Sequence, residues 1–278
     1  MTNINKILLI DVGGTNIDIY EYLPYRKIHK LINQINTRNI DINKWVNSLG
    51  IEIYNDYQKI ILGLPGEVNK KDNEVYCPPL GKKIKIRSIN DNSLETVNDM
   101  FIQPFLIDLN KSKKNKDTII LNSGTSVGLC VVDSNFFLNY ELSYITSFEF
   151  AHEFLHESGK SQPLYDLISQ NSRFHCKKFC SIYSVGGFAA AHGMKVEITK
   201  EEMLRINKTE FDKYIKDERM DAKITSEWIS SLERDLEYFL SKKYKFNSKP
   251  TAIIRGGLIA ALSSSPQKKF LNSFNVDI

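Results

Sequence analysis

The chain has 278 residues, of which 42% are hydrophobic and 25% charged, and these fractions are typical of a globular protein with one large or two medium domains. Its net charge of +4 suits small anionic ligands and argues against nucleic acid as a partner. Because no apolar run approaches the length of a membrane span and no signal peptide opens the chain, we expect a cytoplasmic protein that does not associate with membranes.

The first informative stretch is ILLIDVGGTNIDIY, residues 7–20. A buried apolar run ends in Asp11, and Gly13, Gly14 and Thr15 precede a second β-rich run. Glycines permit a tight turn between strands and let a phosphate approach backbone N–H groups. This stretch alone leaves two interpretations open, a plain β-hairpin or a phosphate-binding turn in which Asp11 holds a metal. A Walker or Rossmann loop is excluded because no helix follows.

Further along the chain, strand patterns alternate with helical patterns. Runs of β-branched and aromatic residues predict strands at Lys6–Ile10, Ile17–Glu21, Lys59–Leu64, Leu94–Val97, Thr118–Leu121 and Leu129–Val132. Apolar periodicity predicts helices at Ile40–Leu49 and Ile224–Leu240. On the second helix the apolar residues of one face are Ile224, Trp228, Leu232, Leu236 and Leu240. This alternation predicts an α/β fold.

The polar run NKSKKNKD, residues 110–117, is the best candidate for a boundary between two halves. We therefore expect one domain over residues 1–110 and a second over residues 111–278. The second half restarts as the first does, with a strand that leads into Gly124 and Thr125 and then a further strand. Two such turns could grip one polyphosphate from both sides.

Asn98 and Asp99 stand directly after the predicted strand Leu94–Val97. The simpler interpretation is a helix N-cap, which Asn and Asp favour. The alternative is a general base, since α/β sheets bind their ligands at the carboxyl ends of strands. Near the C-terminus, TAIIRGGLIAAL predicts a strand that ends at Gly256 and Gly257, either as a tight strand-to-helix turn or as an approach to a flat ligand such as adenine.

Two segments carry weak metal patterns. HEFLH, residues 152–156, matches the short zinc-protease motif, but we identify no third ligand. HCKKFC, residues 175–180, has no second ligand pair at zinc-site spacing. We therefore favour ordinary reduced cysteines over a metal centre.

Taken in order, DVGGTN, LPGEV, ND after a strand, NSGTSVG, FEFAH and IIRGG resemble the bacterial glucokinases of the sugar kinase/Hsp70/actin superfamily. The resemblance runs from the first strand to about residue 260. It implies two ribonuclease-H-like (actin-like ATPase) α/β domains, each with a five-stranded core, that flank a cleft. It also implies a hexose kinase that uses ATP and Mg²⁺, with sugar and ATP as partners, and leaves a homodimer open.

The resemblance assigns a role to each matching residue. The residues implied to bind ATP are Asp11, Gly13, Gly14, Thr15 and Asn16 in the first phosphate motif, Gly124 and Thr125 in the second, and Gly256 and Gly257 in the adenosine motif. The residues implied to bind the sugar are Asn98, Asp99, Glu149 and His152. Asp99 is the implied catalytic base that accepts the proton of the attacking hydroxyl, and Asp11 is the residue implied to lie near Mg²⁺.

Five features depart from the family pattern. Asp18 stands where an Arg is usual, Ser126 replaces a Gly, and Cys180 is nearest the position of a sugar-binding Glu. The segment EVYCPPLGKK lacks the usual Asn and Trp, and only 21 residues follow Gly257. We therefore expect an active or weakened hexose kinase with glucose as substrate. The alternatives are an inactive relative that binds sugar or nucleotide, and a kinase of an N-acetylated amino sugar.

Overall fold

A computed structural model shows two compact units. The first comprises the described residues up to Ile107, and the second the described residues from 116 onward. The boundary expected after residue 110 lies in 108–115, outside the described residues. The structure describes residues 6–49, 56–69, 71–86, 94–107, 116–135, 145–150, 162–172, 179–200, 203–217, 219–244, 250–263 and 275–276.

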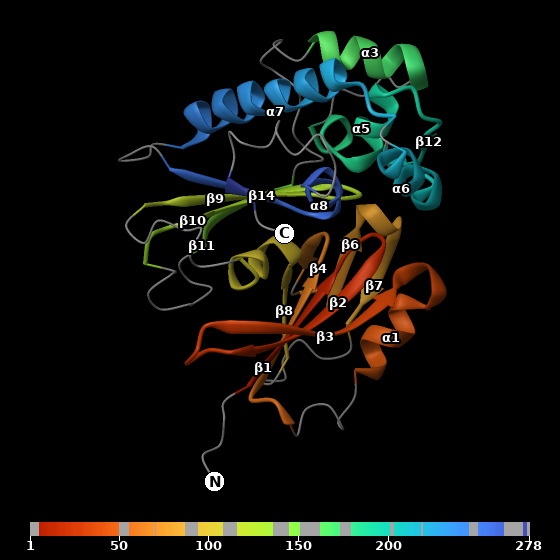
Figure 1. Cartoon of the computed structure of the whole chain (residues 1–278). Helices are drawn as coiled ribbons and strands as arrows, with labels where there is room; N and C mark the ends of the chain where they lie inside the picture. The colour runs from red at the N-terminus through yellow and green to blue at the C-terminus, as the bar shows by residue number, and fades with distance from the viewer. Residues whose placement is uncertain are drawn as a thin grey trace. The chain divides into compact units, whose positions relative to one another are not determined.

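A five-stranded sheet forms the centre of the first unit (Figure 1). Its strands are β1 (Ile7–Val12), β2 (Asn16–Leu23), β3 (Ile28–Asn36), β4 (Lys59–Leu64) and β8 (Leu94–Asn98). Their order is β3-β2-β1-β4-β8, in which β3, β2 and β1 pair antiparallel and β1, β4 and β8 pair parallel. β1 and β4 are nearly continuous buried apolar runs, which suits the middle of a sheet covered on both faces.

The four strands predicted in this half correspond to β1, β2, β4 and β8 within two residues at each end. β3 was not predicted, because most of its residues are exposed and it lacks the alternation of apolar and polar positions that marks a half-buried strand. The helix predicted at Ile40–Leu49 is α1 (Ile42–Ser48), which begins after its N-cap Asp41. Local pattern therefore located the buried elements of this unit and missed its exposed edge.

A smaller antiparallel sheet accompanies the large one. It contains β5 (Glu67–Asn69), β6 (Glu74–Cys77) and β7 (Lys82–Lys85). The described residues of this unit also form the short 3₁₀ helices η1 (Thr37–Asn39), η3 (Pro78–Leu80), η4 (Asp99–Phe101) and η5 (Gln103–Phe105). The last two follow β8 directly and hold the residues of greatest interest below.

The second unit is built on another five-stranded sheet. Its strands are β9 (Thr118–Ser123), β10 (Val127–Val132), β11 (Ile145–Phe150), β14 (Thr251–Arg255) and β15 (Asn275–Val276). The order is β11-β10-β9-β14-β15, with two antiparallel pairs followed by two parallel pairs. This order and these directions repeat those of the first unit, so each unit contains the five-stranded α/β core that the resemblance implied.

Helix α7 (Ala222–Lys243) runs along one face of the second sheet, with α3 (Gln162–Ser172) and α5 (Val185–Ala191) on the same side (Figure 1). The other helices described in this unit are α4 (Phe179–Ile182), α6 (Lys208–Lys216) and α8 (Gly257–Ser263), and a short pair of strands, β12 (Glu197–Ile198) and β13 (Leu204–Arg205), comes between α5 and α6 in the sequence. The predicted apolar face of α7 is confirmed, since Trp228, Leu232, Leu236 and Leu240 are buried in the core and Ile224 packs against it.

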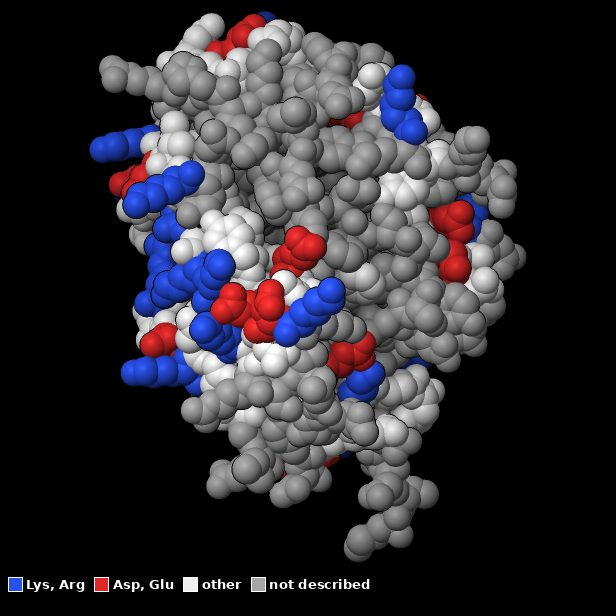
Figure 2. Space-filling model, turned by 180° about the vertical axis from the view of Figure 1, so that it is seen from behind, with Lys and Arg blue, Asp and Glu red and all other residues white. Residues whose placement is uncertain are grey.

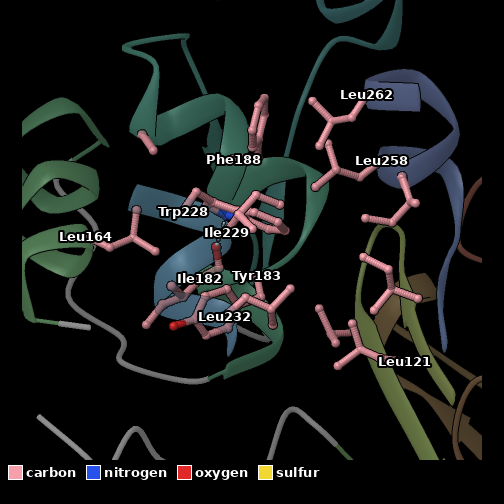
Figure 3. Close-up of a cluster of buried hydrophobic side chains, with 14 of the residues drawn as sticks. Leu121, Leu164, Ile182, Tyr183, Phe188, Trp228, Ile229, Leu232, Leu258 and Leu262 are labelled. Carbon is pink, nitrogen blue, oxygen red and sulfur yellow. Dashed lines mark hydrogen bonds between the residues drawn. The ribbon is translucent and has the colours of Figure 1, made fainter. Parts of the chain in front are cut away.

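Aromatic side chains pack together in the hydrophobic core of this unit (Figure 3). Trp228 packs edge-on against both Tyr183 and Phe188, and its indole N–H donates to the carbonyl of Ile182 at 3.2 Å. The Tyr183 hydroxyl donates to the buried Asp235 carboxylate at 2.6 Å. These contacts connect α7 to the segment around Tyr183, whose carbonyl accepts from the hydroxyl of Ser123 at the end of β9 at 2.8 Å.

Charged side chains of both signs share the face seen in Figure 2, where Lys and Arg lie among Asp and Glu. In the first unit Lys6 pairs with Glu21, Lys59 with Glu95, and Lys83 and Lys85 approach Glu74. Within the described residues, no helix combines the length and apolar character needed to cross a membrane.

Candidate active site

The first candidate phosphate turn joins β1 and β2. Val12 pairs with Ile17, so the turn comprises residues 13–16, and the N–H of Gly13 donates to the carbonyl of Asn16 at 2.8 Å. A Cβ on Gly13 would lie 3.1 Å from that same oxygen, closer than ordinary contact. The turn is thus a tight β-hairpin in which the glycine lets the two chains approach.

Thr37 on η1 holds this turn from outside. Its N–H donates to the carbonyl of Thr15 at 2.9 Å, and its hydroxyl donates to the carbonyl of Gly14 at 3.1 Å. Two consecutive carbonyls are therefore fixed by one residue 22 and 23 positions away. The sequence interpretation missed Thr37, because nothing local connects it to the turn.

Asp11 lies near the carboxyl end of β1, where a glycine on the neighbouring strand leaves room for a second acid. Asp11 pairs with Gly63 on β4, and Gly63 pairs with Val97 on β8. A Cβ on Gly63 would lie 2.6 Å from the Cδ1 of Ile102 and 3.0 Å from the Cα of Asp99. Gly63 therefore allows η4 to pack directly on β4.

Asp99 has a strongly perturbed carboxyl group. Burial raises its pKa from 3.8 to about 8, the negative charge of Asp11 adds to the rise, and the backbone N–H groups of Met100 and Asp99 partly oppose it. Its residue surface is nevertheless partly exposed. A carboxyl group that is partly accessible and titrates near neutral pH is a candidate for proton transfer.

Asn98, the last residue of β8, is a helix N-cap, which is the simpler of the two interpretations of the sequence. Its side-chain oxygen accepts from the N–H of Met100 at 2.9 Å and so caps η4, while its amide donates to the carbonyl of Gly66 at 3.0 Å. The cap does not exclude substrate binding, because an amide group has a second donor and a second lone pair. It does account for the position of Asn98 without a ligand.

Two residues near Asp99 were not singled out by sequence reasoning. Gln103 is buried, and its Nε2 donates to the Oδ2 of Asp11 at 2.9 Å. Cys77, at the end of β6, is also buried, and burial raises the pKa of its thiol, with the charge of Asp99 contributing. No local sequence motif indicates either residue. The partner of Gln103, Asp11, is 92 residues away in the chain.

Asp18, which stands where the glucokinases that the sequence resembles usually have an Arg, lies beside Asp11 across the β1–β2 ladder. Its Oδ1 accepts from the Nε2 of Gln34 on β3 at 2.6 Å. The departure therefore replaces a cation with an acid that is hydrogen-bonded within the sheet.

The second candidate phosphate turn joins β9 and β10 in the other unit. Ser123 pairs with Val127, and the N–H of Gly124 donates to the carbonyl of Ser126 at 2.9 Å. The carbonyl of Gly124 accepts from the N–H of Val185 at 2.9 Å. A Cβ on Gly124 would meet nothing closer than 3.9 Å, so packing does not require a glycine here.

The double glycine after β14 consists of two unlike positions. Gly256 has a φ of +105°, and a Cβ there would overlap the side-chain oxygen of Asn122 and the carbonyl of Ser123. Gly257, the first residue of α8, has open space where a Cβ would lie. Backbone conformation and packing thus explain why residue 256 is a glycine, whereas packing does not require a glycine at residue 257.

The remaining sugar-binding candidates are only partly described. Glu149 lies on β11, where its backbone pairs with Leu129, and its side chain is outside the described residues. His152 and the HEFLH segment lie outside them entirely, as do His175 and Cys176, while Cys180 is placed in α4 by its backbone alone. Among the side chains described, no three His, Cys, Asp or Glu residues gather as a metal site.

No family model and no curated protein matches the sequence. Solved structures do match the fold. A glucokinase from an Antarctic psychrotroph aligns with a TM-score of 0.58 at 12% identity, covering 98% of this chain and 87% of that one. A Listeria monocytogenes protein, provisionally assigned as an N-acetylmannosamine kinase, aligns with a TM-score of 0.54 at 17% identity, covering 98% and 92%.

A third match is a ROK family glucokinase from Streptomyces griseus in complex with glucose and AMPPNP. It aligns with a TM-score of 0.52 at 14% identity and covers 98% of this chain and 90% of that one. At these identities the likeness concerns the fold. The chain has the mixed α/β fold of sugar kinases of known structure.

Proposed function

We propose that this protein catalyses ATP-dependent phosphorylation of a hexose, with glucose converted to glucose 6-phosphate. The observation that carries the proposal is the Asp99 carboxyl group, which lies beside Asp11 at the carboxyl ends of the central strands and whose pKa is raised by burial and by Asp11 to about 8. In open α/β sheets ligands bind at this edge. The fold shared with sugar kinases supports the same reaction class.

Asp99 is the proposed general base. As the primary hydroxyl of the sugar attacks the γ-phosphorus in line, its proton passes to the carboxylate of Asp99, the O–P bond to the sugar forms, and the bond to the bridging oxygen of ADP breaks. A pKa near the working pH suits this role, because the carboxylate is then both available and basic enough to take the proton.

The residues around Asp99 fit a divalent cation. Mg²⁺ prefers oxygen ligands, and proteins usually bind it through only one or two carboxylates together with substrate phosphates. Asp11 supplies a carboxylate oriented by Gln103. Burial is the main cause of the raised pKa of Asp99, and the charge of Asp11, which adds to it, is what a bound cation would neutralise. Mg²⁺ held at Asp11 would neutralise charge on the β- and γ-phosphate oxygens.

The two glycine turns are the proposed phosphate-binding elements. Gly13, Gly14, Thr15 and Asn16 form one, and Gly124 and Thr125 belong to the other. Backbone N–H groups in such turns bind anions without a side-chain charge. Gly257 is the proposed adenosine contact, because its open Cβ position leaves the backbone accessible where packing does not demand a glycine.

A coupled assay that follows ADP release would test the proposal. The purified chain is given ATP, Mg²⁺ and, in turn, glucose, mannose, fructose, N-acetylglucosamine and N-acetylmannosamine, with Asp99→Asn as the matched control. We expect sugar-dependent ADP release with glucose from the native protein alone. Release with an N-acetylated sugar and not glucose would change the substrate, while nucleotide binding without transfer to any sugar would favour a non-catalytic relative.

A further inference from the structure

Gln103 is a buried polar residue whose side chain reaches the candidate metal-binding acid. It opens η5 and is 1% exposed. Its Nε2 donates to the Oδ2 of Asp11 at 2.9 Å, a side-chain contact between segments 92 residues apart. Hydrogen bonds to a charged acceptor are about twice as strong as those between neutral groups, so this bond fixes the orientation of one carboxylate oxygen.

The backbone that carries Gln103 is tied to the backbone that carries Asp99. The N–H of Ile102 donates to the carbonyl of Asp99 at 3.1 Å, the N–H of Phe105 to that of Ile102 at 2.9 Å, and the N–H of Leu106 to that of Gln103 at 3.0 Å. η4 and η5 therefore form one continuous hydrogen-bonded turn after β8. This turn brings both the proposed base and an amide donor to Asp11.

We propose that Gln103 is a positioning residue that orients the Asp11 carboxylate for the metal–nucleotide complex, an inference that rests on the proposed kinase function. Groups that hydrogen-bond to ligating carboxylates orient them, and losing such a partner typically weakens metal affinity about 10–100-fold. Glutamine suits this position because its neutral amide donates a hydrogen bond without adding a charge beside two acids.

The test uses Mn²⁺ as the probe, with the non-hydrolysable ATP analogue AMPPNP and the full chain. Electron paramagnetic resonance of free Mn²⁺ reports the amount bound. Gln103→Met keeps the length of the side chain and removes the donor. Gln162→Met is the matched control, since Gln162 also donates to an aspartate, Asp166 on α3, at 2.6 Å.

We expect Gln103→Met to weaken Mn²⁺ binding about 10–100-fold in the presence of AMPPNP, while the control stays within about twofold of the native chain. In the steady-state assay the Mg²⁺ concentration for half-maximal rate should rise for Gln103→Met, with the KM for sugar unchanged. A residue that only packs would lower the melting temperature in EDTA and would not separate these two constants.

Each outcome has a distinct meaning. If the native chain binds no Mn²⁺ with AMPPNP, the proposed function itself fails. If the native chain binds and Gln103→Met binds equally well, the function stands and the role of Gln103 is overturned. Should Gln103→Met not fold, Gln103→Asn replaces it, because its amide is one carbon–carbon bond too short to reach Asp11 and the same loss of affinity is expected.

Discussion

The proposed base can be tested through stability as well as through turnover. Asp99→Asn preserves the shape of the side chain and removes its titration. In the native chain burial and Asp11 raise the pKa of Asp99 from 3.8 to about 8. Between these two values the folded state keeps a proton that the unfolded state has lost, so the folded state binds more protons and its stability falls as pH rises.

The size of this effect follows from proton linkage. One proton difference corresponds to a slope of about 1.4 kcal/mol per pH unit, so from about pH 5 to about pH 7.5 the loss is at most about 3.5 kcal/mol. Because water reaches part of Asp99, we expect a smaller loss of about 1–2 kcal/mol. Asp99→Asn lacks this titration and should be more stable than the native chain at the higher pH by about the same amount.

The assay is urea unfolding at several pH values in EDTA, with the difference between native chain and variant taken at each pH so that other titrating groups cancel. Turnover is measured in parallel with Mg²⁺, where loss of a general base should cost about a hundred- to ten-thousandfold in rate while the sugar affinity is largely kept. A difference in stability that does not change with pH would refute the raised pKa. Native turnover in the variant would reduce Asp99 to a structural residue of η4.

Four further substitutions test packing and, at Gly124 and Gly257, ligand binding. Gly124→Ala should leave the melting temperature unchanged, since a Cβ there meets nothing closer than 3.9 Å. It should weaken AMPPNP binding in calorimetry about tenfold if a phosphate approaches this backbone. Unchanged affinity would show that this turn is a plain β-hairpin that binds no phosphate. Gly256→Ala should lower the free energy of unfolding in urea by more than about 1 kcal/mol, because Gly256 has a φ of +105° and a crowded Cβ position. Gly257→Ala should leave the free energy of unfolding unchanged or raise it by up to about 1 kcal/mol, and yet weaken AMPPNP binding. Equal stabilities of the two variants would contradict this reasoning. Tyr183→Phe should cost about 1.5–3 kcal/mol in urea unfolding, because its hydroxyl donates to the buried Asp235 at 2.6 Å, and a cost near zero would show that this bond contributes no net stability.

The sequence alone was sufficient to locate the strands and helices whose apolar residues are buried. The apolar runs that became β1, β4 and β9 and the apolar face of α7 are readable because a residue that is buried in one regular element recurs with the period of that element. The two glycine turns are readable for a similar reason, since a tight reversal between adjacent strands needs few residues and all of them are neighbours in the chain. The order of these motifs was also enough to indicate the sugar-kinase fold.

Tertiary structure alone decided which side chains meet. No spacing rule connects Gln103 to Asp11, and only the packing of η4 on Gly63 shows why a glycine is needed in β4. The raised pKa of Asp99 depends on burial and on the charge of Asp11, two quantities that a linear sequence does not contain. Likewise, Gly256 and Gly257 are identical letters in the sequence, but the end of β9 crowds only the first, because contacts between distant segments are set by the sheet and not by local propensity.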